Sequence, residues 1–324
     1  MSDSPAVSRS TSYTAVVGPT AVGKSDFALE LAVQMLADGV PGVDIISVDS
    51  KQVYHGLEIL SGADIPPGWS WLEPSQNLTG SRYTVFANPA QTIYLHGVSI
   101  LTPDQEWSVA HFQQFAREII DSATKSGRAV LFVGGTGLYY AHLFSTDPLL
   151  HVGPDLVLRQ RVEQLGLAEL QAEVQQQAPQ RWQEMNHSDQ QNPRRLIRVL
   201  EKELAKVGSN GLAIDDQTIG EQQNQQLIYL GLTADLAVLE ARITARVHKR
   251  FEGGAVEEVE RLLRLSPPAT DQAKATLGVG DIQKFLAGES SAVDCQKNWA
   301  LHEFQYAKRQ LKWWKKQVVE WQVL

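Results

Sequence analysis

The sequence offers almost nothing for cross-linking or for crossing a membrane. Cys295 is the only cysteine among 324 residues, so no intrachain disulfide can form. No apolar run approaches the ~20 residues that a membrane-spanning helix needs. The first 12 residues, MSDSPAVSRSTS, have no apolar centre, so we expect a frayed tail there and not a signal peptide. These absences favour a cytoplasmic protein that has no membrane partner.

Positive charge is also scarce. The chain has 29 Lys and Arg against 37 Asp and Glu, and the net charge of −8 argues mildly against nucleic-acid binding. The apolar fraction of 43% and the charged fraction of 20% are those of a globular protein. At 324 residues the chain exceeds a typical single domain, so we expect two domains or one domain with a large insertion.

The most specific motif is Gly18–Ser25, which reads GPTAVGKS and has the G-x-x-x-x-G-K-[ST] spacing of a phosphate-binding P-loop. Residues 13–17 (YTAVV) read as a buried strand and residues 26–36 as a helix, which is the context that such a loop requires. Lys24 would supply a positive charge and Ser25 a hydroxyl for Mg²⁺. The residues that we expect to bind a di- or triphosphate are Gly18, Thr20, Ala21, Gly23, Lys24 and Ser25.

Asp49 follows a second buried strand, predicted at 44–48. Ligands of open α/β sheets lie beyond the carboxyl ends of the strands, so Asp49 should face the phosphate site. The alternative is that Asp49 only caps a following helix.

Further along, Ser108 should cap a helix at 109–126, and a third strand at 129–133 leads into Gly134-Gly135-Thr136-Gly137. Glycines at this strand end suggest a backbone that lies close to a ligand. Residues 62–98 read as an irregular surface excursion, with weak alternation at 81–94 that would suit a small hairpin. Strands that alternate with helices indicate a parallel, three-layered sheet.

The second half of the chain carries clustered basic residues. Residues 154–206 read as a helical insertion, in which Arg194, Arg195 and Arg198 form a basic stripe. A strand at 227–232 and a helix at 235–251 follow, and the arginines of that helix usually indicate only a solvated face. From residue 295 onward, Lys and Arg alternate with Trp, which suits either nucleic-acid binding or a docked amphipathic helix.

We therefore predict a P-loop NTPase-like α/β fold, a parallel sheet flanked by helices with a helical insertion domain, and a monomer. The predicted parts are a disordered tail at 1–12, a catalytic core at 13–150 and 227–324, a helical insertion at 151–210 and a loop at 211–226.

The ordered motifs resemble a known family. GPTAVGKS, DSKQVY, VGGTGLYY, RRLIRVLE, RITARVHKRF and YAKRQLKWW occur in the order seen in tRNA dimethylallyltransferases, also called tRNA isopentenyltransferases. The resemblance extends from about residue 14 to residue 316. It implies transfer of a dimethylallyl group from dimethylallyl diphosphate to the exocyclic amine of the adenine next to the anticodon, with the base flipped out of its loop.

The resemblance also implies roles for particular residues. Asp49 matches the family's general base, Arg246 matches an arginine that stabilises the departing diphosphate, and Arg242 lies one turn before it. Thr136 matches a threonine that lines the reaction channel. Lys24 and Mg²⁺ on Ser25 would add to the charge stabilisation. The residues that would contact tRNA are Asp49, Ser50, Lys51, Gln52, Arg194, Arg195, Arg198, Lys308 and Arg309.

The chain departs from the family pattern on the RNA side. The family's G-Y-[KR] turn reads Gly278-Val279-Gly280 here, and its T-R-Q reads Glu303-Phe304-Gln305. We therefore predict weaker tRNA binding than is typical of the family. Three alternatives remain: an adenylate isopentenyltransferase that uses a free nucleotide, a P-loop kinase, and a paralogue that binds RNA or nucleotide without catalysis.

Overall fold

The structure is a computed structural model that describes residues 11–63, 65–74, 79, 81–208, 225–317 and 320–323. The chain divides into two compact units, residues 1–144 with 224–324 and residues 145–223. Residues 1–10 and 209–224, which include most of the predicted tail and most of the predicted 211–226 loop, lie outside the described residues. Where the two predicted segments are described, they were predicted wrongly, because residues 11–12 and 225–226 belong to paired strands.

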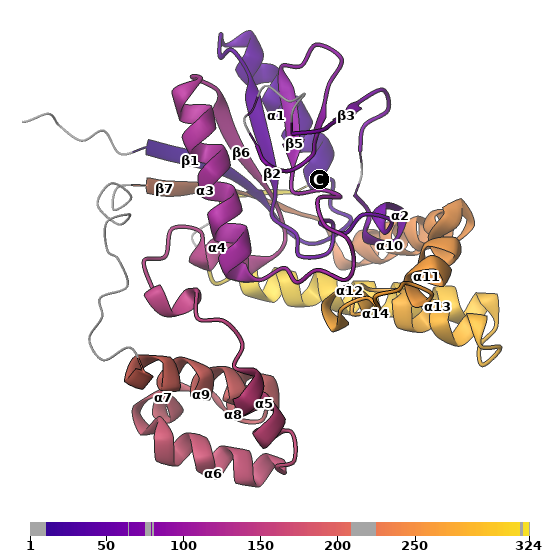
Figure 1. The fold of residues 1–324 in the computed structure, drawn as a ribbon. Coiled ribbons are helices and arrows are strands. Elements are labelled where there is room, and N and C mark those ends of the chain that lie inside the picture. Colours follow the sequence, from indigo (N-terminus) through magenta and orange to yellow (C-terminus); the bar gives the residue numbers. More distant parts are fainter. Residues whose placement is uncertain are drawn as a thin grey trace, which may run out of the picture. The chain divides into compact units, whose positions relative to one another are not determined.

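The first unit is built on one sheet (Figure 1), and its described strands lie in the order β3-β4-β5-β2-β6-β1-β7-β8. Every pairing from β5 through to β8 is parallel, whereas β3–β4 and β4–β5 are antiparallel. The strands are β1 (Thr11–Val17), β2 (Val43–Ser47), β3 (Ser70–Leu72), β4 (Val85–Ala87), β5 (Ile93–His96), β6 (Ala129–Gly134), β7 (Gln225–Thr233) and β8 (Glu320–Val323). The predicted parallel sheet is confirmed.

The segment 62–98 was predicted wrongly as an irregular surface excursion, although the small hairpin suggested within it at 81–94 is confirmed by the antiparallel pairing of β4 with β5. It contributes β3, β4 and β5, and β5 pairs with β2 inside the sheet. The side chain of Asn88 closes the β4–β5 turn by accepting the backbone N–H groups of Thr92 and Ile93 at 2.8 and 3.0 Å. Strands of three or four residues carry too little periodicity to stand out, and pairing with neighbours decides their structure.

Helices cover both faces of the sheet because residues along each central strand alternate between two apolar cores. Ala15 and Val17 of β1 pack with α3 (Val109–Lys125), α4 (Gly137–His142) and the C-terminal helices. Val16 packs instead with α1 (Lys24–Ala37). Ser108 caps α3 as predicted, since its hydroxyl accepts the N–H of His111 at 3.2 Å.

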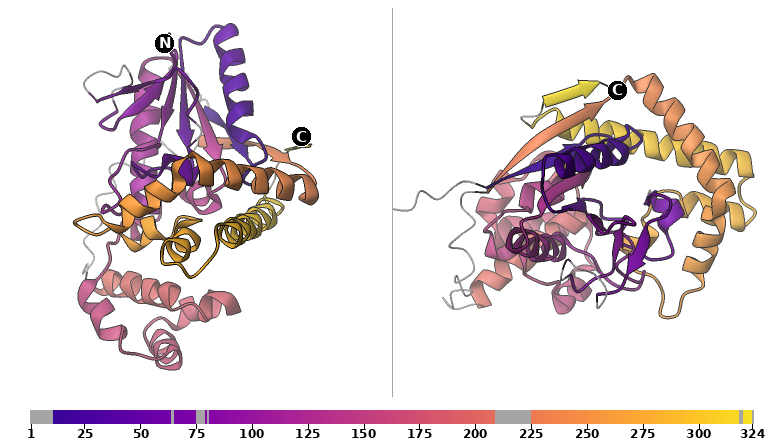
Figure 2. Two further views of the ribbon diagram at one scale, coloured as in Figure 1. Left: turned by 90° about the vertical axis from the view of Figure 1, so that its right-hand side faces the viewer. Right: turned by 90° about the horizontal axis from the view of Figure 1, so that it is seen from above.

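The C-terminal part of this unit is helical. Its elements are α10 (Leu236–Arg250), a π-helical turn (Phe251–Ala255), α11 (Val256–Leu263), α12 (Asp271–Lys274), α13 (Val279–Leu286) and α14 (Ala292–Trp314); the short α2 (Glu58–Ser61) packs beside the π-helical turn. Helices α10 and α14 run side by side (Figure 2). Trp299 and Trp314 are fully buried, so these aromatics of α14 serve as core and not as an RNA-stacking surface.

The second unit is a small helical bundle with its own apolar core. It contains a 3-10 turn (Pro148–Leu150) and helices α5 (Leu156–Val162), α6 (Leu167–Gln177), α7 (Pro179–Glu184), α8 (His187–Gln190) and α9 (Pro193–Gly208). Leucines and valines from α5, α6 and α9 fill the core. Within the described residues, no helix of either unit is long and apolar enough to cross a membrane.

Candidate active site

The turn between β1 and α1 has the backbone of a phosphate-binding loop. Gly18, Ala21 and Gly23 all have positive φ angles of 146°, 63° and 102°. At Gly18 a Cβ atom would clash with the carbonyl oxygen of Leu232, so only glycine fits there. Helix α1 then begins at Lys24, and its free N–H groups add a partial positive charge at the loop.

Two helices that are distant in sequence hold this loop. The side-chain oxygen Oε1 of Gln310 on α14 accepts the backbone N–H of Thr20 at 2.8 Å. The Nη2 of Arg246 on α10 donates to the Thr20 hydroxyl at 2.7 Å. The ammonium of Lys24 donates to the Pro19 carbonyl oxygen at 2.7 Å and so folds back over the loop. Contacts from α10 and α14, together with the Lys24 contact within the loop, therefore hold the loop in this conformation.

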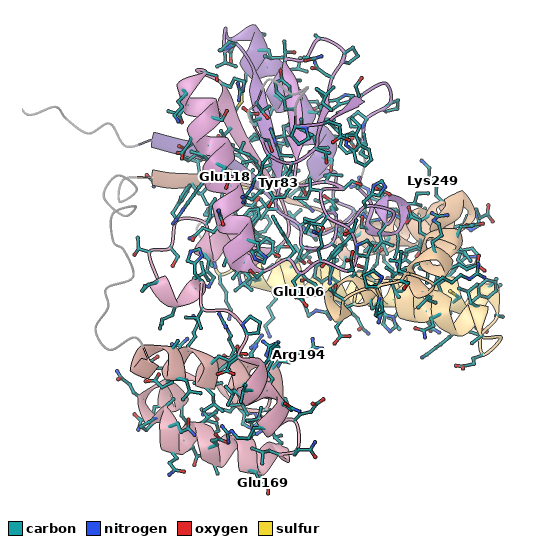
Figure 3. The ribbon with its side chains drawn as sticks, viewed as in Figure 1. Tyr83, Glu106, Glu118, Glu169, Arg194 and Lys249 are labelled. Carbon is teal, nitrogen blue, oxygen red and sulfur yellow. The ribbon has the colours of Figure 1, made fainter. Side chains whose placement is uncertain are left out.

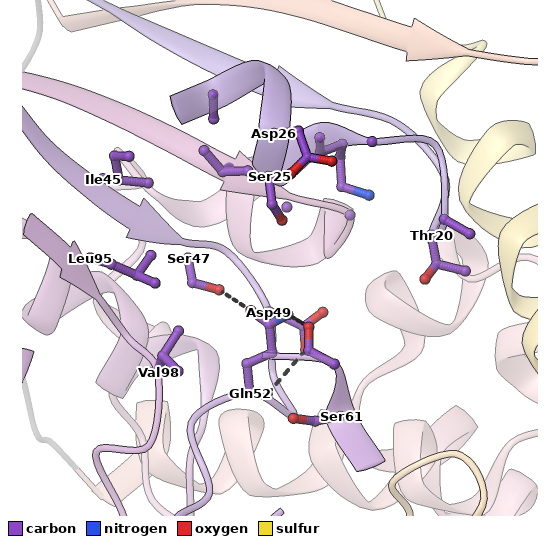
Figure 4. Close-up of a pocket in the computed structure, with 18 of the residues that line it drawn as sticks. Thr20, Ser25, Asp26, Ile45, Ser47, Asp49, Gln52, Ser61, Leu95 and Val98 are labelled. Carbon is purple, nitrogen blue, oxygen red and sulfur yellow. Dashed lines mark hydrogen bonds between the residues drawn. The ribbon is translucent and has the colours of Figure 1, made fainter. Parts of the chain in front are cut away.

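A cavity opens in front of the loop, at the carboxyl ends of β2 and β6 (Figure 4). The predicted residues among its lining are Thr20, Ala21, Gly23, Lys24, Ser25, Asp49, Gln52 and Arg246. Lining residues that the sequence did not single out include Asp26, Ser47, Gly62, Arg250, Tyr306 and Gln310. Gly18, Ser50, Lys51, Thr136 and Arg242 were predicted as site residues but are not part of the lining.

Asp49 lies at the end of β2 and projects into this cavity (Figure 4). Its Oδ1 accepts the backbone N–H groups of Lys51 and Gln52 at 2.8 and 3.4 Å. These bonds stabilise a turn, and the next helix begins only at Glu58, so Asp49 is not a helix cap. They occupy one of the two carboxylate oxygens.

Two tyrosines lie close enough to sense the charge of Asp49. Burial, followed by that charge, raises the pKa of the Tyr139 hydroxyl and the pKa of the Tyr306 hydroxyl well above the ordinary value. Neighbouring polar groups oppose the rise in the pKa of Tyr306 only in part. Both phenols are therefore neutral near pH 7, and Asp49 is the acidic group at this end of the cavity.

Gln52 and Lys51 make fixed contacts inside the protein. The hydroxyl of Ser47 donates to Gln52 Oε1 at 2.6 Å (Figure 4). Gln52 Nε2 donates to the Gly62 carbonyl at 2.8 Å. Lys51 donates to the Gln272 carbonyl at 2.6 Å, which joins this turn to α12. Lys51 therefore stabilises the turn that carries Asp49 without lining the cavity itself.

The glycines after β6 are explained by neighbouring protein groups. A Cβ atom at Gly134 would clash with the backbone of Val48, and one at Gly135 with the side chain of Gln310. At Gly137 it would meet the ring of Trp313. The groups that approach these glycines are the backbone of Val48, directly after β2, and side chains of α14. Gly134 and Gly135 also line the cavity, and the expected approach of a ligand there stays a prediction.

The arginines of α10 differ in position. Arg246 pairs with Glu303 of α14 as well as with Thr20. Arg250, one turn later, donates to the same Glu303 at 3.1 Å and lines the cavity. Arg242 instead donates to the Val22 carbonyl at 3.4 Å and lines an adjoining pocket, which shares Ala21, Gly23 and Asp26 with the cavity. Sequence reasoning missed Glu303 and Arg250, although Glu303 stood out as a departure from the family pattern.

Comparison with known proteins agrees with this geometry. The sequence profile of the family described as IPP transferase matches residues 86–317. The chain belongs to the IPP transferase family. A tRNA dimethylallyltransferase of Exiguobacterium sp. is 34% identical over 95% of this chain and 89% of the relative, and one of Thermobifida fusca is 30% identical over 93% and 86%. The crystal structure of full-length tRNA isopentenylpyrophosphate transferase from Bacillus halodurans superposes with a TM-score of 0.57 at 26% identity, covering 97% of this chain and 90% of that one.

In this member of the IPP transferase family, some of the arginines that were predicted to bind RNA form ion pairs within the protein. In the helical unit, Arg195 pairs with Asp189, and Arg198 pairs with Glu201 at 3.0 Å. Burial raises the pKa of Glu201, but hydrogen bonds from Arg159 and Arg198 outweigh it, so the pKa is lowered overall. Arg194 is exposed (Figure 3) and takes part in none of the ion pairs found among the described residues.

The basic residues of α14 remain on its surface. Lys308 and Arg309 are exposed, and they lie over the rings of Phe304 and Tyr306 at 4.7 and 5.7 Å from the ring centroids. Val279, at a position where the IPP transferase pattern has Tyr, is only 2% exposed and belongs to the main core. The presence of Val279 in place of the Tyr of the family pattern therefore concerns the packing of the core.

Proposed function

We propose that this protein transfers a dimethylallyl group from dimethylallyl diphosphate to the exocyclic amine of the adenosine adjacent to the anticodon of a tRNA. Its membership of the IPP transferase family supports a prenyl transfer to tRNA. The single observation that carries the proposal is that Asp49 and the P-loop residues Lys24 and Ser25 line one cavity. That cavity thus combines a diphosphate site with a candidate base.

In the proposed reaction the bond between the allyl carbon and the diphosphate oxygen breaks, and its electron pair leaves with the diphosphate. Lys24, Arg246 and the N–H groups of the P-loop are placed to stabilise the negative charge that develops there. Thr136 and Arg242 lie outside the lining of the cavity, and Arg242 donates to the Val22 carbonyl of the P-loop.

Mg²⁺ fits the donor set on the diphosphate side. The Ser25 hydroxyl and the carboxylates of Asp26 and Asp49 line the same cavity, and Mg²⁺ prefers such oxygen ligands together with water and substrate phosphates. Among the residues that the structure describes, no group of three or more His, Cys, Asp or Glu side chains is arranged to hold a metal ion. The ion would supply additional charge stabilisation to the leaving group.

The adenine amine forms the new carbon–nitrogen bond and must lose a proton. In our proposal Asp49 accepts that proton, through the carboxylate oxygen that the turn does not use. Arg194, Lys308 and Arg309 are the exposed cations that we propose for contacts with tRNA phosphates. Arg195 and Arg198 already pair with carboxylates, so we expect them to contribute less.

The test offers labelled dimethylallyl diphosphate to the protein together with bulk tRNA in one reaction and AMP in another. Label in tRNA, lost in Asp49→Asn, is the expected result. Label in AMP but not in tRNA would favour the adenylate isopentenyltransferase, and label in neither would favour a lapsed paralogue or a kinase.

A further inference from the structure

We infer that the end of the cavity away from the P-loop holds the hydrocarbon chain of the prenyl substrate and that Leu95 limits the length of that chain. This inference rests on the proposed function, because it concerns the prenyl diphosphate of the same cavity. Ile45, Leu95 and Val98, called the apolar end, line the cavity together with residues of the P-loop. Figure 4 shows these three residues on one side of the cavity and Thr20 of the P-loop on the other.

The apolar end is built by two neighbouring strands. Ile45 of β2 and Leu95 of β5 are paired in the parallel register, so their side chains project from the same face of the sheet. Helix α1 packs on that face, and its Ala28 and Leu29 also line the cavity. Because α1 begins at the P-loop, apolar side chains of this helix and of the two strands continue from the diphosphate site toward Leu95.

Packed side chains close the apolar end. Val98 is 2% exposed and belongs to a separate apolar cluster with Ala63 and Phe86, and Leu95 and Trp69 pack against the same cluster. Val98 and Leu95 thus have the cavity on one side and a filled core on the other. Protein interiors are close-packed, so a longer chain could extend past Leu95 only by displacing side chains.

The chemistry of the apolar end suits a hydrocarbon better than the adenine base. Its three side chains are aliphatic, whereas a flipped base is held by stacking and by hydrogen bonds to its edges. The neighbouring polar side chains already bond within the protein: the Ser47 hydroxyl donates to Gln52 Oε1, and Gln52 Nε2 donates to the Gly62 carbonyl. We therefore place the hydrocarbon chain at the apolar end and the adenine amine at Asp49.

This arrangement makes Leu95 a determinant of substrate choice. A geranyl group is one isoprene unit longer than a dimethylallyl group, and in a hydrophobic pocket a single methylene changes discrimination about 10–200-fold. The reaction is the same for both chains. The carbon–oxygen bond breaks with its electron pair on the diphosphate, the carbon–nitrogen bond forms, and the amine proton goes to Asp49.

The experiment compares labelled dimethylallyl diphosphate with labelled geranyl diphosphate as substrates for transfer to bulk tRNA. The wild type should prefer the dimethylallyl group by about 100-fold or more in kcat/KM. Leu95→Ala should shift this preference toward geranyl by about tenfold or more, because it removes side-chain volume where the longer chain must lie. Leu36→Ala is the matched control, because Leu36 of α1 packs half-buried against the same core as Leu95 but does not line the cavity. Its preference should match that of the wild type.

A binding measurement separates the contribution of the chain from that of the diphosphate. In calorimetry, Leu95→Ala should bind inorganic pyrophosphate as the wild type does. It should bind dimethylallyl diphosphate about 3–10-fold more weakly, because apolar contact with the chain is lost. Should Leu95→Ala fail to fold, Leu95→Val removes only one methylene and should shift both assays in the same directions by smaller factors.

Three results would overturn the inference. They are equal use of the two diphosphates by the wild type, an equal preference in the Leu95 variant and in Leu36→Ala, and a raised KM for tRNA in the Leu95 variant with an unchanged prenyl preference. The last result would place the base, and not the chain, at the apolar end. If the wild type transfers the dimethylallyl group and one of these results is found, only this inference fails. If the wild type labels tRNA with neither diphosphate, the proposed function itself fails.

Discussion

Replacing Asp49 with asparagine removes the candidate base of the active site but keeps the acceptor that stabilises the turn after β2. Asn keeps an Oδ1 that can accept the N–H groups of Lys51 and Gln52, so the turn after β2 should persist. Since asparagine and aspartate cap backbone donors comparably, we expect the free energy of unfolding to change by less than about 1 kcal/mol. The second oxygen becomes an NH₂ group, which cannot accept a proton.

The expected loss in kcat is about 10²–10⁴, the usual contribution of general-base catalysis, which corresponds to roughly 3–5 kcal/mol of transition-state stabilisation. Initial rates with labelled dimethylallyl diphosphate at saturating tRNA give kcat, and filter binding checks that tRNA affinity is unchanged. Asp38→Asn is the matched control, because Asp38 is an exposed residue after α1 whose side chain accepts from its helical neighbour Gln34.

Asp49→Ala extends the comparison, since it removes the base and the turn acceptor together. We expect a kcat close to that of Asp49→Asn, with a lower melting temperature. A kcat for Asp49→Asn within about threefold of wild type, together with a strong loss in Asp49→Ala, would refute the base and leave Asp49 as a turn residue.

Three further results are expected. Lys24→Ala should lower kcat about 10²–10³-fold and weaken diphosphate binding, and turnover near that of the wild type would count against the P-loop role. Full activity of the wild type in excess EDTA would count against the metal role. Val279→Tyr should lower the free energy of unfolding by about 1–3 kcal/mol in urea titrations, because Val279 is buried in the core; a variant as stable as wild type would show that the core has room for the ring. The double variant Lys308→Ala/Arg309→Ala should bind all tRNAs more weakly to the same extent, and its slope of log affinity against log salt should be smaller by about 2. The control double variant Lys284→Ala/Lys297→Ala removes two other exposed lysines and should change neither the affinity nor the slope.

Local signals in the sequence located the phosphate loop and the Ser108 cap, since both depend on residues within one turn of chain. Weak alternation suggested the β4–β5 hairpin, but neither β3 nor the pairing of β5 with β2 could be predicted in this way, because burial of residues such as Phe86 and Tyr94 is decided by neighbouring strands. The pairing of Arg250 with Glu303 joins residues 53 apart, and a run of arginines on a helix gives no sign of which one turns inward.

The hydrogen bond from Thr20 to Gln310 spans 290 residues and has a consequence for synthesis on the ribosome. Translation at about 5–20 residues per second separates the two partners by roughly 15–60 s. During that interval β1 also waits for β7, which pairs with it along its whole length. A nascent chain therefore lacks the β7 partner of β1 until residue 233 has been translated, and it lacks the bond from Thr20 to Gln310 until α14 has been translated, so the complete set of contacts around the phosphate loop forms late.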